Sequence, residues 1–162
     1  MSHLVSIIIP VKDRIDWFQE TLESVFSQSY PNIEVIIVDD GSAPSVQSLL
    51  PGLLEKPNVV ILRNETSQGV GAAREIGRLA AKGSFINYLD SDDVLHPRMI
   101  QESVNALRES PDAGMCYCTC VRFRELPITG KEPVWKSSDQ INPHINLIDL
   151  VFARPWGTGA CL

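Results

Sequence analysis

Short apolar runs alternate with segments of helical periodicity along most of this chain. The runs lie at residues 4–10, 33–38, 59–62 and 85–89, and the first is apolar almost throughout. Runs of this length that end at Gly, Pro or Asp are typical of strands buried on both faces of a parallel sheet. Apolar residues at helical spacing separate them. The order predicts an α/β fold, Rossmann-like, in which helices flank both faces of a mainly parallel (mixed) sheet.

The rest of the chain continues this pattern less clearly. A helix is expected after Pro97, with a fifth strand at residues 113–123. Gly83 follows the helical segment at residues 70–82 and is expected to end that helix. Residues 124–143 contain many turn-forming residues and predict a long loop with a short strand, and residues 145–152 predict a short helix.

Composition excludes several classes of protein. The chain has 162 residues, 44% of them hydrophobic, which suits one folded domain with a substantial core. A net charge of −6 without a Lys/Arg cluster argues against nucleic-acid binding. No apolar run is long enough to span a bilayer, and no signal peptide is expected at the N-terminus. The alternating cysteines at 116, 118 and 120 lack zinc-site spacing, so we expect small buried side chains in a reducing cytoplasm, with a metal or redox role as the alternative.

The run at residues 85–89 ends in a cluster of acidic residues. Asp90, Asp92 and Asp93 follow it within four positions. Carboxylates this close repel one another unless a cation lies among them, and Mg²⁺ or Mn²⁺ prefers such oxygen ligands together with phosphates. The stretch therefore predicts a metal site for a phosphorylated ligand. The alternative is a solvated acidic turn that caps the next helix.

Acidic side chains also follow two other predicted strands. Asp13 comes after the first strand, and Asp39 and Asp40 come after the second. Because the ligand crevice of an open α/β sheet lies outside the carboxyl ends of its strands, we expect these groups to meet the acidic cluster there.

Four segments together resemble a known family. They are VSIIIPV at residues 5–11, VDDGS at 38–42, GVGAAR at 69–74 and YLDSDD at 88–93. Their order and spacing are similar to those of the family 2 glycosyltransferases of the GT-A type, over residues 5–123. The resemblance implies a nucleotide-sugar donor, expected to be a UDP-sugar. It also implies transfer with inversion and a divalent metal, Mn or Mg.

The resemblance also implies roles for individual residues. Pro10, Val11 and Asp13 match the loop along the base and ribose, and Asp40 matches the acid that accepts a hydrogen bond from the base. A second set lies nearer the phosphates of the donor. Gly69 and Arg74 match the segment near the nucleotide, and Asp90, Ser91 and Asp92 match the D-x-D motif, with Asp92 as the direct metal ligand and Asp90 orienting the ribose or a metal-bound water.

The same resemblance divides the chain into a donor-binding domain at residues 1–123 and the start of an acceptor-side region at 124–162. The expected acceptor is a polysaccharide, a lipid-linked sugar or another glycan. The expected location is the cytoplasm, including peripheral association with the inner face of the membrane. No acid after residue 123 matches the family's catalytic base. We therefore expect the natural protein to continue past Leu162, and these residues to bind donor but transfer little sugar.

Three other functions stay open on the sequence alone. Gly69, Gly71 and Arg74 partly match a dinucleotide-binding fingerprint, although a glycine is missing and the motif follows the third strand. Residues 90–94 match the D-x-D-x-V signature of haloacid dehalogenase-type phosphatases, whose first Asp is a nucleophile. A module that binds nucleotide-sugars without turnover is the third alternative.

Overall fold

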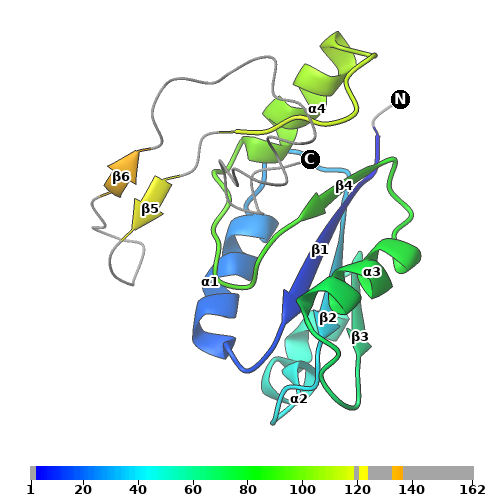
Figure 1. The fold of residues 1–162 in the computed structure, drawn as a ribbon, viewed down its shortest axis with the longest axis vertical. Coiled ribbons are helices and arrows are strands. Elements are labelled where there is room, and N and C mark those ends of the chain that lie inside the picture. The colour runs from blue at the N-terminus through cyan, green and yellow to red at the C-terminus, as the bar shows by residue number, and fades with distance from the viewer. Residues whose placement is uncertain (1–2, 119–120, 124–132, 137–162) are drawn as a thin grey trace.

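A four-stranded parallel sheet forms the centre of the molecule (Figure 1). The computed structural model describes residues 3–118, 121–123 and 133–136. The strands of this sheet stand in the order β3-β2-β1-β4. Their bounds are β1 Val5–Val11, β2 Ile33–Asp39, β3 Val59–Arg63 and β4 Phe85–Tyr88. The four predicted strands are thus present, and the α/β fold class is confirmed.

Helices lie on both faces of the sheet, as the sequence predicts. They are α1 Ile15–Phe26, α2 Val46–Leu49, the 3-10 helix η1 Pro51–Glu55, α3 Val70–Ala80 and α4 Met99–Glu109. Within the described residues, no helix is both long and apolar enough to cross a membrane.

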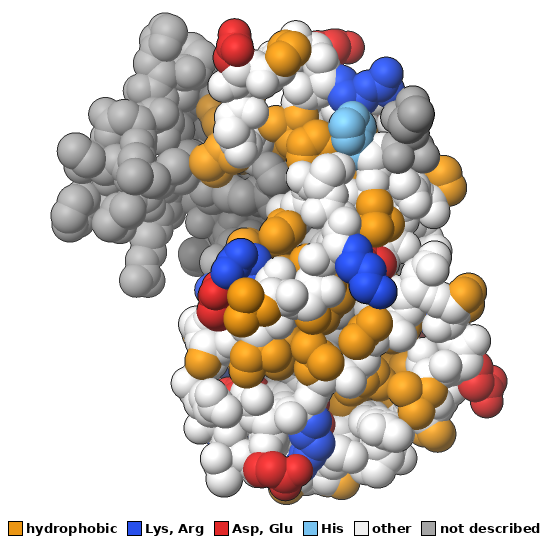
Figure 2. All heavy atoms as spheres, turned by 90° about the vertical axis from the view of Figure 1, so that its right-hand side faces the viewer, with side chains coloured by type: hydrophobic (Ala, Val, Ile, Leu, Met, Phe, Trp, Pro, Cys, Tyr) orange, Lys and Arg blue, Asp and Glu red, His pale blue; other side chains and the backbone are white. Residues whose placement is uncertain are grey.

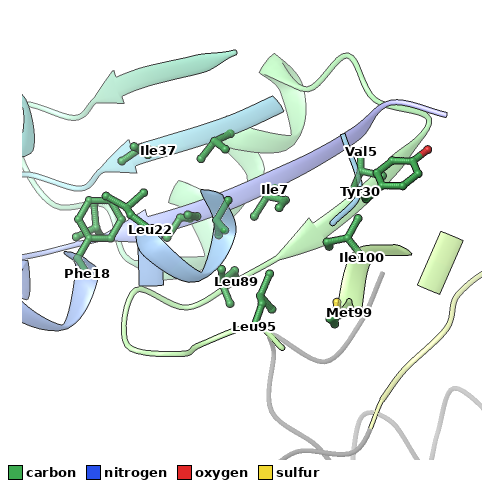
Figure 3. Packing of buried hydrophobic residues seen from close by; sticks show 14 of the residues in the cluster. Val5, Ile7, Phe18, Leu22, Tyr30, Ile37, Leu89, Leu95, Met99 and Ile100 are labelled. Atoms are coloured by element: carbon green, nitrogen blue, oxygen red, sulfur yellow. The ribbon is translucent and has the colours of Figure 1, made fainter. Parts of the chain in front are cut away.

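The larger part of the core lies between the sheet and helices α1 and α4 (Figure 3). Alternate residues of a strand point to opposite faces, so Ile7 and Ile9 of β1 share this side with Ile37 of β2. The helices contribute the buried side chains Phe18, Leu22, Met99, Ile100 and Val104. Trp17 and Phe26 also belong to the apolar repeat of α1, but both are exposed, so the repeat is wider than the face that packs.

The opposite face is covered by α3. Ile8 of β1 and Val38 of β2 pack there against Ala73 of the helix. Figure 2, which views the side on which α3 lies in Figure 1, shows hydrophobic side chains across the middle of this face. Close packing depends on Gly77, because a Cβ at this position would lie 2.3 Å from Cγ2 of Ile8.

The strand order creates a crevice at the carboxyl edge of the sheet. The chain passes from β1 to β2 and β3 in one direction and then returns to place β4 on the other side of β1. The loops after β1 and β4 are therefore neighbours at the point where the chain reverses its direction across the sheet, and ligands of open α/β sheets bind at such a point.

The predicted fifth strand is only partly present among the described residues. Residues 113–118 form no strand, whereas Val121–Phe123 forms β5, which pairs antiparallel with β6, Pro133–Lys136, in a separate two-stranded sheet. The remaining residues of the prediction, 119–120, lie outside the described ones. Cys116 and Cys118 are partly buried and pack against the core on the α1 side. Their alternation therefore reflects contact with the core and not a place in the main sheet. The short strand expected within residues 124–143 is present as β6, whereas the helix expected at residues 145–152 lies outside the described residues.

Gly83 does not have the helix-ending role that its position suggests. Helix α3 ends at Ala80, with Ala81 as its C-cap. The N–H of Gly83 donates to Oγ of Ser6 at 2.8 Å, and a Cβ on Gly83 would lie 2.7 Å from the backbone nitrogen of Ser6. Glycine is required there because two backbone segments approach closely.

The contact beneath Gly77 gives a test of how α3 packs. We expect Gly77→Ala to destabilise the protein, since overpacking a core typically costs about 1–3 kcal/mol. Gly71→Ala in the same helix is the matched control. No atom lies within 4 Å of a Cβ at that position. That variant should be stabilised by up to about 1 kcal/mol through helix propensity. Chemical denaturation measures both, and equal stabilities for the two variants would contradict this packing.

Candidate functional site

A cleft of about 500 Å³ lies at the carboxyl edge of the sheet. Segments that follow all four parallel strands line it. The cleft is lined by Pro10 and Val11 at the end of β1, Lys12 and Arg14 after it, Asp40 after β2, Ser67, Gly69, Val70 and Arg74 after β3, and Asp90, Ser91 and Asp92 after β4. A smaller hollow of about 320 Å³ elsewhere is lined by residues such as Tyr30, Ile33 and Lys56 and contains no acidic side chain.

Asp39 fixes the loop that follows β2. Its carboxylate is almost completely buried and accepts hydrogen bonds from the backbone N–H groups of Ser42 at 2.8 Å and Val46 at 3.0 Å. It also forms an ion pair with Arg63 at the end of β3. Burial opposes ionisation, but the hydrogen bonds from Ser42, Val46 and Arg63 hold the pKa of Asp39 below its usual value. Asp39 is therefore a structural anchor beside the cleft.

Asp40 fixes the other loop, which leads into α3. Its side chain accepts four hydrogen bonds, from Nδ2 of Asn64 at 2.7 Å, Oγ of Ser67 at 2.7 Å, and the N–H groups of Gln68 at 2.8 Å and Gly69 at 2.9 Å. Burial again works against ionisation, yet these four donors lower the pKa of Asp40 to about 2. The carboxylate stays charged at neutral pH and joins the end of β2 to the start of α3.

These bonds bear on the predicted contact between Asp40 and the nucleobase. Each carboxylate oxygen already accepts two hydrogen bonds, which uses about all its lone-pair directions. A base can bond to Asp40 only if one donor moves. Ser67 and Gly69 are the donors that also line the cleft, and the hydroxyl of Ser67 can turn away more easily than the backbone N–H of Gly69.

Close packing between the two loops depends on Gly41. This residue has φ +79°, and a Cβ there would lie 2.9 Å from the backbone nitrogen of Ser67. Glycine meets both demands, the positive φ and the close approach. The loops that Asp39 and Asp40 fix are thus also in direct contact.

The acidic residues after β4 are each placed differently. Nη2 of Arg74 donates to Oδ1 of Asp90 at 2.5 Å, and Arg14 forms an ion pair with Asp92. Burial raises the pKa of Asp93 to about 6, and the charges of Asp90 and Asp92 contribute to the same shift. Negative charge is therefore concentrated at this turn, as the sequence predicts.

This donor set fits a divalent metal only together with ligand phosphates. Across residues 3–118 and the two short strands, no group of three or more His, Cys, Asp or Glu side chains is arranged to hold a metal by itself. Mg²⁺, however, usually takes one or two carboxylates, with waters and substrate phosphates as its other ligands. Asp92 lines the cleft with a partly exposed carboxylate, and Asp90 lies beside it.

Most of the residues predicted for the site line this one cleft. They are Pro10, Val11, Asp40, Gly69, Arg74, Asp90, Ser91 and Asp92. Asp13 does not line it, because its carboxylate accepts a hydrogen bond from the N–H of Ala43 at 2.9 Å. The roles of these residues in binding stay predictions.

Sequence reasoning missed four residues that line the cleft: Lys12, Arg14, Ser67 and Val70. A signal for two of them was present, because Lys12 and Arg14 flank Asp13 in a loop already assigned to the donor. Cationic side chains are expected beside a diphosphate.

The hydrogen bonds of Asp40 give a direct test of its structural role. We expect Asp40→Asn to lower the free energy of unfolding at pH 7 by about 2 kcal/mol, because charge-assisted hydrogen bonds are lost. The pKa of Asp40 is lower in the folded protein than its ordinary value of 3.8. The advantage of the wild type should therefore be complete above about pH 4 and should shrink as the pH falls towards 2. Urea denaturation at several pH values measures this.

Asp112→Asn is the control for this experiment, since Asp112 is exposed. Its stability should stay within about 0.5 kcal/mol of the wild type. An Asp40→Asn protein as stable as this control at pH 7 would show that the four hydrogen bonds do not hold the loop.

Solved structures share this fold. The chain superposes on residues 1–349 of TarS from Staphylococcus aureus with a TM-score of 0.68 and 25% identity, covering 76% of this chain and 38% of that one. The same TarS fragment has been solved with UDP and with UDP-GlcNAc. The mannosyltransferase PcManGT from Pyrobaculum calidifontis, solved with GDP-Man and Mn²⁺, gives a TM-score of 0.66 at 21% identity, covering 75% of this chain and 36% of that one. These likenesses confirm the GT-A type of α/β fold.

Curated relatives point the same way. The chain is 33% identical over 110 residues to glycosyltransferase GlyG of Streptococcus pneumoniae, covering 67% of this chain and 36% of GlyG. It is 32% identical over 112 residues to the putative glycosyltransferase EpsH of Bacillus subtilis, covering 69% of this chain and 33% of EpsH. The chain thus spans about a third of the length of these two relatives. The pattern of the family described as Glycosyl transferase family 2 matches residues 6–155. The chain therefore belongs to glycosyl transferase family 2, as the four sequence segments indicate.

Proposed function

We propose that the cleft binds a nucleotide-sugar, UDP-sugar first among the candidates, as the donor site of a glycosyltransferase that acts on a glycan acceptor. One observation carries this proposal. Segments after all four parallel strands meet in one cleft, where carboxylates and cationic side chains lie together. Family membership and the likeness to TarS, which has been solved with UDP and UDP-GlcNAc, support the choice of donor.

The proposed placement of the donor follows from the charges. Asp92, with Asp90 beside it, would hold Mn²⁺ or Mg²⁺ at the end of β4. A divalent ion bound there supplies positive charge for the diphosphate leaving group. Arg74 lines the same cleft, and its Nε–H is buried without a hydrogen-bond partner. A phosphate oxygen within reach of this guanidinium would compensate the cost of that unpaired donor.

Transfer with inversion further needs a base within hydrogen-bond reach of the acceptor hydroxyl. The carboxylates that line the cleft are already engaged, Asp40 by four donors, Asp90 by Arg74 and Asp92 by Arg14. We therefore propose that none of these three carboxylates is the base and that the cleft itself serves donor binding.

Calorimetric titration with UDP, with and without Mn²⁺, tests the donor site. We expect Mn²⁺ to tighten UDP binding. Asp92→Asn should weaken binding in Mn²⁺ about tenfold or more, since it loses a charged ligand contact, without weakening binding in the absence of metal. Asp112→Asn is again the control and should behave like the wild type. Equal UDP affinity of the wild type with and without Mn²⁺ would contradict the metal role, and no binding at all would contradict the donor site.

A further inference from the structure

The backbone of Arg14 is held by helix α1, whereas its side chain is exposed and lines the cleft. The N–H of Phe18 donates to the carbonyl oxygen of Arg14 at 3.0 Å, which is the first hydrogen bond of α1. The side chain, in contrast, is 61% exposed and reaches from the loop after β1 to Asp92 in the loop after β4. The guanidinium can therefore move without disturbing the helix.

Each of the two carboxylates of the D-x-D segment, which would otherwise be free to bind a metal, forms an ion pair with an arginine. Arg14 pairs with Asp92, and Arg74 pairs with Asp90. Across the cleft, the positive charges of Lys12, Arg14 and Arg74 balance the negative charges of Asp40, Asp90 and Asp92. A divalent cation alone would upset this balance, and so would a diphosphate alone. The two together would change it little.

The two ion pairs differ in how exposed their side chains are, and the more exposed pair separates more easily. The side chains of Arg14 and Asp92 are 61% and 38% exposed, whereas those of Arg74 and Asp90 are 25% and 33% exposed. Exposed ion pairs contribute little to stability because water screens them. Separation of Arg14 from Asp92 is therefore the easier change.

We propose that Arg14 is a donor-positioning residue, which neutralises Asp92 in the empty cleft and binds the diphosphate once a metal has taken its place on Asp92. This inference rests on the proposed function. Arg14 and a metal compete for the same carboxylate oxygens, and their like charges repel. The released guanidinium stays in the cleft, where its planar pair of N–H donors matches the oxygens of a phosphate. Arg14 thereby makes binding of the metal and binding of the diphosphate favour each other.

Two titrations of Arg14→Gln test this, and the proposal predicts effects of opposite sign. With Mn²⁺ alone, followed by the electron paramagnetic resonance signal of free Mn²⁺, the variant should bind the ion about fivefold more tightly, because its competitor is gone. With UDP at saturating Mn²⁺, followed by calorimetry, it should bind UDP about tenfold more weakly, because a charged contact to phosphate is lost. A residue that only braced the loop would weaken both.

Two further variants separate charge from position. Lys12→Gln removes the same charge from the same loop, and Lys12 also lines the cleft. It should change affinity for Mn²⁺ alone by less than twofold. Arg14→Lys keeps the charge without the planar fork, so its UDP affinity at saturating Mn²⁺ should fall between those of the wild type and Arg14→Gln. Thermal unfolding of each variant checks that the fold is intact.

The outcomes distinguish this inference from the proposed function. If Mn²⁺ tightens UDP binding in the wild type, but Arg14→Gln changes neither titration or weakens both, the role of Arg14 is overturned and the donor site stands. A gain in affinity for Mn²⁺ alone as large in Lys12→Gln as in Arg14→Gln would also overturn it, since general charge would then explain both. If the wild type binds no UDP at any Mn²⁺ concentration, the donor site and the role of Arg14 fall together.

Discussion

Two consecutive carboxylates at the end of β2 hold the loops that form one side of the cleft. Asp39 binds the loop after its own strand and the end of β3, and Asp40 binds the loop that leads into α3. Both side chains are buried and both are held ionised by their hydrogen bonds. Buried charges are costly unless they are paired, so these carboxylates tie the two loops to the sheet and to each other.

The other side of the cleft follows from topology and is held more loosely. The loops after β1 and β4 lie side by side because β4 returns to the far side of β1. Their link across the cleft is the exposed pair of Arg14 and Asp92, in place of a buried network. The loops held by Asp39 and Asp40 are thus firmly fixed, whereas the loops joined by Arg14 and Asp92 can adjust. This arrangement suits a ligand whose metal and phosphates must enter between the two sets of loops.

The sequence could predict the sheet and most of the cleft, because both depend on local patterns. Buried strands are visible as apolar runs, and polar residues at their carboxyl ends must meet at one edge of a parallel sheet. Contacts between residues far apart in the chain leave no such pattern in the sequence. The alternation of Cys116 and Cys118 suggested a strand, whereas it reflects packing on the core. Likewise, the four donors to Asp40 and the ion pair of Arg14 join residues far apart in the chain.

The central claim is that the cleft at the carboxyl edge receives the diphosphate of the donor. A crystal structure of the chain with UDP and Mn²⁺, with anomalous data collected at the manganese edge, tests it most directly. The account predicts a manganese peak at about 2 Å from a carboxylate oxygen of Asp92, the usual distance for an ion of this type, with the diphosphate as a co-ligand. A diphosphate bound elsewhere, such as the hollow beside Tyr30 and Lys56, would contradict it.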